Sequence, residues 1–231
     1  MYSEEDAGEW TQKIAGASGD TLLQTWMLGK TPVEHAQRLA ASGGVRFQKS
    51  LRVLDAGCGT GQLLLLLKVL YPEASMYGIN LFQSQLDLNC FGDQLHLFQG
   101  SIADPDAYRA LGGEPFDVVF MNYTSGHLST AELKQAFCNI AERMAPNARL
   151  VLWDITARSV MVRTFFEYRL RLPSEVSAIA EKAGLRPFER RVGFEDVSMT
   201  DSFLKATTAE EQSLFEHSAL PVLYVFVKSE E

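Results

Sequence analysis

Three glycines spaced two residues apart form the most distinctive stretch of the chain. The run VLDAGCGTG (residues 53–61) places an acid near the end of an apolar stretch, with the glycines directly after it. Glycine has no Cβ, so a turn built from alternating glycines lets a ligand contact the backbone itself. Residues 62–70 read as a buried helix whose first amides would face that ligand. The pattern therefore predicts a small-molecule site between a strand end and a helix start.

The order of these glycines differs from that of dinucleotide-binding loops, which follow G-x-G-x-x-G. Here the order is D-x-G-x-G-x-G, and no Lys-Ser or Lys-Thr pair follows it to bind a phosphate. The stretch resembles motif I of the class I S-adenosylmethionine (SAM)-dependent methyltransferases. In that family the loop packs against the methionine part of SAM. The resemblance implies SAM as cofactor, bound here by Asp55, Gly57, Cys58, Gly59 and Gly61.

A second motif lies at residues 78–85, GINLFQSQ, at the end of the next predicted strand. It is similar to a signature of the cyclopropane fatty-acid synthases, mycolic-acid methyltransferases, and sterol and terpenoid C-methyltransferases. Asn80 and Gln85 match that signature, whereas Phe82 replaces its usual Ser. Class I enzymes usually have an acid at the position of Asn80, where an amide offers one acceptor oxygen and no charge. The resemblance assigns Asn80, Leu81 and Gln85 to the cofactor; alternatively, Gln85 is only an exposed helix residue.

A third cofactor position follows the third predicted strand, at Ser101 and Ile102. Many relatives have an Asp here that receives the adenine amino group. Ser101 can still accept a hydrogen bond, but without charge assistance. Two acids usual in the family are therefore neutral in this chain. Either SAM binds more weakly here, or it binds with a different geometry.

Candidate catalytic residues follow the fourth predicted strand. Open α/β sheets bind ligands outside the carboxyl ends of their strands, so Asn122, Tyr123 and His127 should line the site. Asn122 is assigned to the cofactor. His127 matches a histidine common at this point in class I small-molecule methyltransferases, and a neutral imidazole can act as a general base near pH 7. Alternatively, it packs against SAM or caps the next helix.

Residues 155–173 combine arginines with aromatic side chains, and in class I enzymes this connection commonly builds part of the acceptor pocket. Arginine binds phosphate or carboxylate through paired hydrogen bonds, and aromatic faces stabilise cations. Glu167 could remove a proton after methyl transfer to an alkene, and Tyr123 could do the same. The alternative is an amphipathic helix with its aromatic residues in the core. The residues expected to contact the acceptor are Arg158, Arg163, Phe166 and Arg169.

Composition limits the class of partner. The 231 residues carry a formal net charge of −8, which disfavours RNA or DNA as the substrate because nucleic-acid enzymes normally present a basic face. The acidic N-terminus does not resemble a signal peptide, and the longest apolar run is too short to span a bilayer. Three cysteines without metal-ligand spacing indicate a reduced, cytoplasmic protein. No metal site is expected, and nothing supports Mg²⁺. The oligomeric state stays open.

The elements that must position these residues alternate between strands and helices, which predicts a parallel sheet covered on both faces. Expected strands span 52–56, 75–80, 95–99, 117–122, 148–154, 186–194 and 222–228; expected helices span 61–71, 83–91, 130–144 and 174–183. The last two strands lack a helix between them, which allows an antiparallel pair. This is the α/β, Rossmann-like, three-layer class I methyltransferase fold, with a seven-stranded sheet whose last strand is antiparallel. We expect a single domain: a helical cap over the cofactor (1–50) and the core (51–231).

Three interpretations of function remain. The first is a SAM-dependent methyltransferase of a small molecule, either C-methylating an isoprenoid or lipid-like alkene or methylating O or N of an anionic metabolite. The second is a SAM-binding protein that catalyses a non-methylating reaction such as a cyclisation. The third is an interaction module with a vestigial pocket, which the complete glycine loop disfavours.

Overall fold

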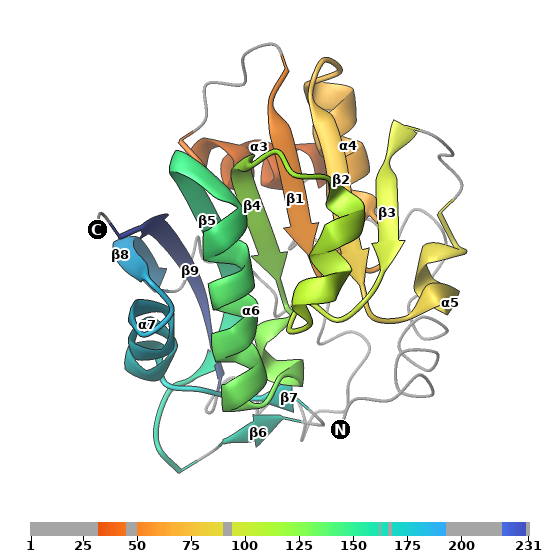
Figure 1. The fold of residues 1–231 in the computed structure, drawn as a ribbon. Helices are drawn as coiled ribbons and strands as arrows, with labels where there is room; N and C mark the ends of the chain where they lie inside the picture. Colours follow the sequence, from red (N-terminus) through yellow and green to blue (C-terminus); the bar gives the residue numbers. More distant parts are fainter. Residues whose placement is uncertain are drawn as a thin grey trace.

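A seven-stranded sheet with strand order β3-β2-β1-β4-β5-β9-β8 forms the centre of the molecule (Figure 1). The computed structural model describes residues 32–44, 50–89, 94–161, 163–165, 168–192 and 219–229. The strands are β1 (Arg52–Ala56), β2 (Ser75–Asn80), β3 (His96–Gln99), β4 (Phe116–Asn122), β5 (Met144–Ala157), β8 (Leu185–Val192) and β9 (Ala219–Lys228). β9 is antiparallel to both β5 and β8, while β1 to β5 pair in parallel. The expected fold class, including the antiparallel last strand, is confirmed.

Helices cover both faces of the sheet and complete three layers. One face carries α3 (Pro32–Ser42) and α4 (Gln62–Leu70), and the other carries η2 (Pro105–Leu111), α6 (Thr130–Arg143) and α7 (Pro173–Glu181) (Figure 1). Successive strand residues point to opposite faces, so each central strand feeds both cores. In β1, Val53 packs on the α4 side and Leu54 on the α6 side, and both are fully buried.

The helix predicted over 83–91 and the alternative of an amphipathic helix over 155–173 both differ from the structure. α5 (Gln83–Leu86) ends earlier than the expected residue 91, and the Asn89 side chain beyond it donates to the Thr60 carbonyl at 2.9 Å. Among the described residues of 155–172 there is no helix. Instead β5 continues to Ala157, and two short antiparallel strands follow, β6 (Thr164–Phe165) and β7 (Tyr168–Arg169). Aromatic and β-branched residues favour this extended backbone.

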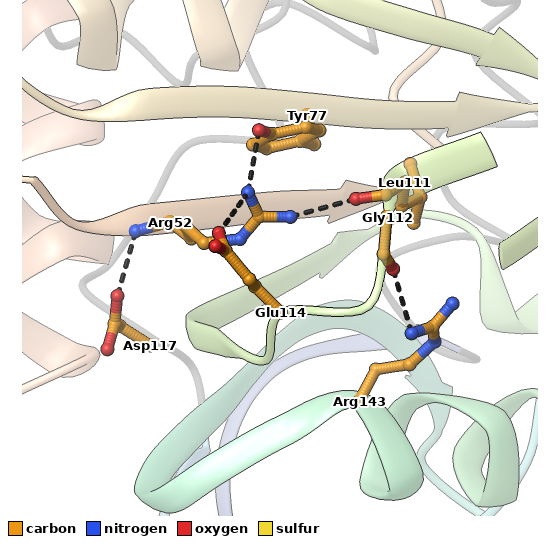
Figure 2. Close-up of polar contacts among 7 residues, drawn as sticks. All are labelled: Arg52, Tyr77, Leu111, Gly112, Glu114, Asp117 and Arg143. Carbon is orange, nitrogen blue, oxygen red and sulfur yellow. Dashed lines mark hydrogen bonds and ion pairs between the residues drawn. The ribbon is translucent and has the colours of Figure 1, made fainter. Parts of the chain in front are cut away.

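A polar network around Arg52 closes the sheet at the amino ends of its strands (Figure 2). The guanidinium donates to the Tyr77 hydroxyl at 2.7 Å and the Leu111 carbonyl at 2.8 Å, and it pairs with Glu114 at 3.2 Å. The Arg52 amide donates to the Asp117 carboxylate at 2.8 Å. These contacts give partners to the charged groups of Arg52, Glu114 and Asp117 at the sheet's amino edge.

Of the first fifty residues, the structure describes 32–44 and residue 50. Here α3 packs against α4 through buried Ala36, Leu39 and Ala40. The remainder of the expected helical cap lies outside the described residues, so the single-domain arrangement with a cap over the cofactor stays a prediction.

Candidate cofactor and acceptor site

The glycine loop joins β1 to α4 at the carboxyl edge of the sheet. Gly57, Gly59 and Gly61 all have positive φ (92°, 54° and 82°), a backbone conformation that favours glycine. A Cβ on Gly57 would lie 2.3 Å from Thr124 Oγ1, and one on Gly61 would lie 2.8 Å from Asn89 Nδ2. A Cβ on Gly59 would meet no described atom within 4 Å. The loop therefore packs against protein at its two ends and exposes its middle backbone to a ligand.

Two buried acceptor oxygens beside this loop lack a protein donor. Asp55, at 3% exposure, has no hydrogen-bond partner for Oδ1 within the described structure, and the same holds for Oδ1 of Asn122. They lie at the carboxyl ends of the adjacent strands β1 and β4. Burial raises the pKa of Asp55 to about 7. Orphaned buried acceptors are costly, so the pair fits a ligand that brings donors and positive charge.

Cys58 contributes its backbone to the loop and its small side chain to the core. Its amide donates to the Ile79 carbonyl at 3.0 Å, as the Gly57 amide does at 2.8 Å, which ties the loop to β2. The thiol packs so closely on Gly78 that a Cβ there would lie 2.6 Å from Sγ. Burial, followed by the charge of Asp55, raises the pKa of Cys58. The thiol is therefore a packing group rather than a nucleophile.

Asn80 joins the two predicted cofactor motifs. Its Oδ1 accepts from the Gly59 amide at 3.1 Å, and its Nδ2 donates to Gln85 Oε1 at 2.9 Å and to the Phe82 carbonyl at 3.1 Å. A carboxylate could make the first contact but not the two donations. The neutral residue at this position thus holds the turn together, while Leu81 beside it is 49% exposed.

Hydrogen bonds to protein groups hold the predicted adenine-binding turn at Ser101 and Ile102. Ser101 Oγ accepts from the Ala103 amide at 3.2 Å. The Ile102 side chain is buried in the core, and its carbonyl accepts from the Tyr108 hydroxyl and from Asn139 Nδ2, both at 3.1 Å. These buried contacts position the turn without using the Ser101 backbone amide.

The loop after β4, residues 123–128, carries two of the three candidate catalytic residues, Tyr123 and His127, and is called the acceptor loop below. Tyr123 has φ 49°, and its ring lies 4.7 Å from that of Trp153. Burial, followed by the nearby Asp154 charge, raises the pKa of Tyr123 well above its ordinary value. His127 ends the short helix η3 (Ser125–His127), and its ring stands edge-on to Tyr168, with the centroids 4.8 Å apart.

The three predicted acceptor arginines differ in how closely their guanidinium groups are already bound to protein groups. Arg163 pairs with Glu175 at 2.6 Å, and Arg158 Nε donates to the Ala219 carbonyl at 2.6 Å. Arg169 is exposed, and one long contact of 3.4 Å joins it to the His127 carbonyl. Phe166 and Glu167 lie outside the described residues. Among the three described candidates, Arg158, Arg163 and Arg169, it is Arg169 that contacts the acceptor loop.

Three site residues escaped prediction from the sequence: Asp154, Tyr168 and Arg171. Asp154 is fully buried, and its oxygens accept from the Ser125 amide, the Ile155 amide and the Tyr168 hydroxyl. The available signal was the acid at the end of the fifth apolar stretch, the same pattern that singles out Asp55.

Neither a candidate metal site nor a membrane-spanning helix is found in the described part of the chain. No group of three His, Cys, Asp or Glu side chains is arranged there to hold a metal ion. None of its helices is both long and apolar enough to cross a bilayer.

Comparison with known proteins decides the family. Residues 32–199, most of the chain, match the model of a family described as a methyltransferase domain. The chain belongs to this family. Two solved structures resemble the methyltransferase across most of its length. The [4+2]-cyclase SpnF has a TM-score of 0.74 at 12% identity, covering 99% of this chain and 97% of its own.

The second structure is geranyl diphosphate C-methyltransferase from Streptomyces coelicolor, in complex with Mg²⁺, geranyl diphosphate and S-adenosyl-L-homocysteine. Its TM-score is 0.67 at 16% identity, covering 84% of this chain and 77% of its own. Such distant likenesses establish the shared fold. A sequence relative, the tRNA1(Val) (adenine(37)-N6)-methyltransferase of Porphyromonas gingivalis, is 25% identical over 121 residues, 43% of this chain. The chain spans about half (48%) of the length of that curated relative.

Proposed function

We propose that this methyltransferase uses SAM to methylate a small molecule at the carboxyl edge of its sheet. The observation that carries the proposal is the open backbone at Gly59 beside the orphaned oxygen of Asp55. Asp55 is also destabilised as an anion, with its pKa raised to about 7 by burial. A cationic ligand would relieve both the missing donor and the unpaired charge.

Each part of the cofactor has a group of residues that fits it. Asp55 and Asn122 offer acceptors to an ammonium group, and the Gly59 backbone offers close approach. The Asn80–Gln85 pair offers amide groups to the ribose, and the turn at Ser101 and Ile102 would meet the adenine. When bound, the cofactor supplies a methyl group on a positively charged sulfur, which activates it for transfer.

The protein's own contribution is to position the acceptor and to exclude water. With the cofactor held in this way, an electron pair of the acceptor would form the new bond to the transferred methyl group, and the departing sulfur would keep the pair of the broken bond. For an oxygen or nitrogen acceptor, His127 would accept the proton released. The raised pKa of Tyr123 keeps its phenol neutral, so it acts as a hydrogen-bond donor rather than as the base.

Within this function we favour C-methylation of an isoprenoid or lipid-like alkene. The hydrogen bond between Asn80 and Gln85 supports the C-methyltransferase resemblance, because the two matching residues act together. Aromatic rings near the acceptor loop would shelter a cation formed on the alkene: Tyr123, Trp153 and Tyr168. Glu167 would take the proton that this cation loses to give the methylated alkene.

The test is transfer of label from methyl-labelled SAM to a panel of isoprenyl diphosphates, fatty acyl lipids, phenols and carboxylates, with and without Mg²⁺. Label in an alkene product, with formation of S-adenosylhomocysteine, is the expected result. Label only in phenols or carboxylates would replace C-methylation by O-methylation. A transformed acceptor with neither label nor S-adenosylhomocysteine would establish the cyclase alternative and overturn methyl transfer.

A further inference from the structure

We infer that Asp154 and Tyr168 form a positioning pair that sets the His127 ring and fastens the β6–β7 ribbon to the acceptor loop. The inference deepens the proposed function and rests on it for the catalytic part. Neither residue belongs to the cofactor motifs, and both come from the β5 end and the segment that follows it. Four observations carry the inference.

The first observation is that both carboxylate oxygens of Asp154 have hydrogen-bond donors. Its Oδ2 accepts from the Ser125 amide at 3.1 Å, and its Oδ1 accepts from the Ile155 amide at 2.7 Å and from the Tyr168 hydroxyl. The residue has no exposed surface. Unlike Asp55, this carboxylate has donors on both oxygens without any ligand, so its role is to hold other groups in place.

The second observation is the fit of Tyr168 into the acceptor loop. Its hydroxyl donates to Asp154 Oδ1. A Cβ on Gly126 would lie 2.1 Å from Tyr168 Cε1, so the ring occupies the space that any other residue there would fill. Tyr168 is thus fixed at its hydroxyl and along its ring edge.

The third observation is the contact between this fixed ring and His127. The two rings stand at 87°, edge to face, with centroids 4.8 Å apart. Such aromatic contacts have a preferred geometry, so each ring restricts the orientation of the other. A rotation of Tyr168 would therefore change the orientation of the imidazole, which makes Asp154 and Tyr168 positioning residues for it.

The fourth observation is that neighbouring residues fasten the same two segments. Arg171 is buried and donates to the carbonyls of Ser125 at 2.8 Å and Leu128 at 2.6 Å. The Ala157 amide donates to the Arg171 carbonyl at 2.8 Å, which ties this segment back to β5. The ribbon and the acceptor loop consequently form one unit, with the Asp154–Tyr168 contact at its centre.

The kinetic test removes the hydroxyl alone, with Tyr168→Phe. With an oxygen or nitrogen acceptor, whose proton His127 would take, we expect kcat to fall on the order of tenfold because a small misplacement of a catalytic group is costly, while the KM for SAM stays unchanged. In a His127→Gln background the same substitution should cause no further loss, because the two residues act through one group. Losses that multiply across the two substitutions would overturn the inference.

Tyr77→Phe is the matched control, since it removes a hydroxyl that accepts from Arg52 at the opposite edge of the sheet. It should lower stability without changing kcat. An equal loss of kcat in Tyr77→Phe would show that Tyr168 acts only through general stability.

A second readout needs no turnover and separates this inference from the proposed function. In histidine-labelled protein, with His127 assigned through His127→Gln, the His127 ring resonances should move in Tyr168→Phe and stay fixed in Tyr77→Phe. Unmoved His127 resonances in Tyr168→Phe would overturn the positioning pair, whatever the activity. Absence of methyl transfer with moved resonances would instead overturn only the proposed function.

Discussion

Two buried acids at the ends of buried strands look alike in the sequence and differ in the structure. Asp55 ends β1 with Oδ1 unpartnered in the described structure, whereas Asp154 in β5 has donors on both oxygens. A charge left without partners is costly to the folded protein, while a saturated one organises its surroundings. Asp55 is therefore suited to binding a ligand, whereas Asp154 holds neighbouring protein groups in place.

Asp55 should make the ligand-free protein less stable as pH rises. Its pKa of about 7 in the folded state exceeds the ordinary 3.8, so the folded state holds the proton more tightly than the unfolded state between these values. The contribution to the free energy of unfolding consequently falls from about pH 4 to about pH 7. Asp55→Asn removes this loss and should be the more stable protein at pH 7.5, by about 1–4 kcal/mol.

The measurement is urea unfolding of both proteins at pH 5 and pH 7.5 without ligand. The stability difference between Asp55→Asn and the native sequence should widen at the higher pH. A difference that does not change with pH would contradict a buried, unpaired carboxyl at this position.

At the scale of elements, the strands and the glycine loop are predictable from the sequence because their signals are local. β1 and β2 start and end at the predicted residues, since buried parallel strands are short apolar runs with polar residues or turns at their ends. The β6–β7 ribbon is not predictable in this way. Its position depends on Tyr168 reaching Asp154 and Gly126, which are contacts between segments far apart in the sequence.

The fastening of this ribbon should depend on Arg171 and not on Arg169. Arg171→Met removes two hydrogen bonds from a buried guanidinium and should lower the free energy of unfolding by about 2 kcal/mol. Arg169 is exposed with one long contact, so Arg169→Met should change stability by less than about 0.5 kcal/mol. Denaturant unfolding of the two variants makes the comparison, and equal effects would contradict the proposed fastening.

At the scale of the whole molecule, the sheet separates a structural edge from a functional one. The amino edge is closed by the Arg52 network, and the carboxyl edge collects the glycine loop, the orphaned acceptors and the acceptor loop (Figures 1 and 2). This division follows from parallel strands, whose carboxyl ends all meet at one edge. The same topology explains why Asp55, Asn80 and Asn122 could be grouped from the sequence alone.

The net charge of −8 adds an expectation about partners. Affinity for RNA comes largely from basic side chains on phosphates, so the methyltransferase should not bind tRNA detectably, even at low salt. A gel-shift titration with unmodified tRNA checks this, with a known tRNA-binding protein as the positive control. A salt-sensitive shift would favour a function like that of the Porphyromonas gingivalis relative instead.

The most direct measurement is calorimetric titration of SAM into the native protein and two glycine variants. Gly59→Ala and Gly184→Ala both place a Cβ at positive φ where no described atom lies within 4 Å, but Gly184 lies at the α7–β8 turn, away from the glycine loop. The two share the strain of about 1 kcal/mol that a side chain suffers there. We predict that the native protein and Gly184→Ala bind SAM, while Gly59→Ala loses most of the affinity. No binding to the native protein, or equal binding to all three, would contradict a cofactor held by the glycine loop.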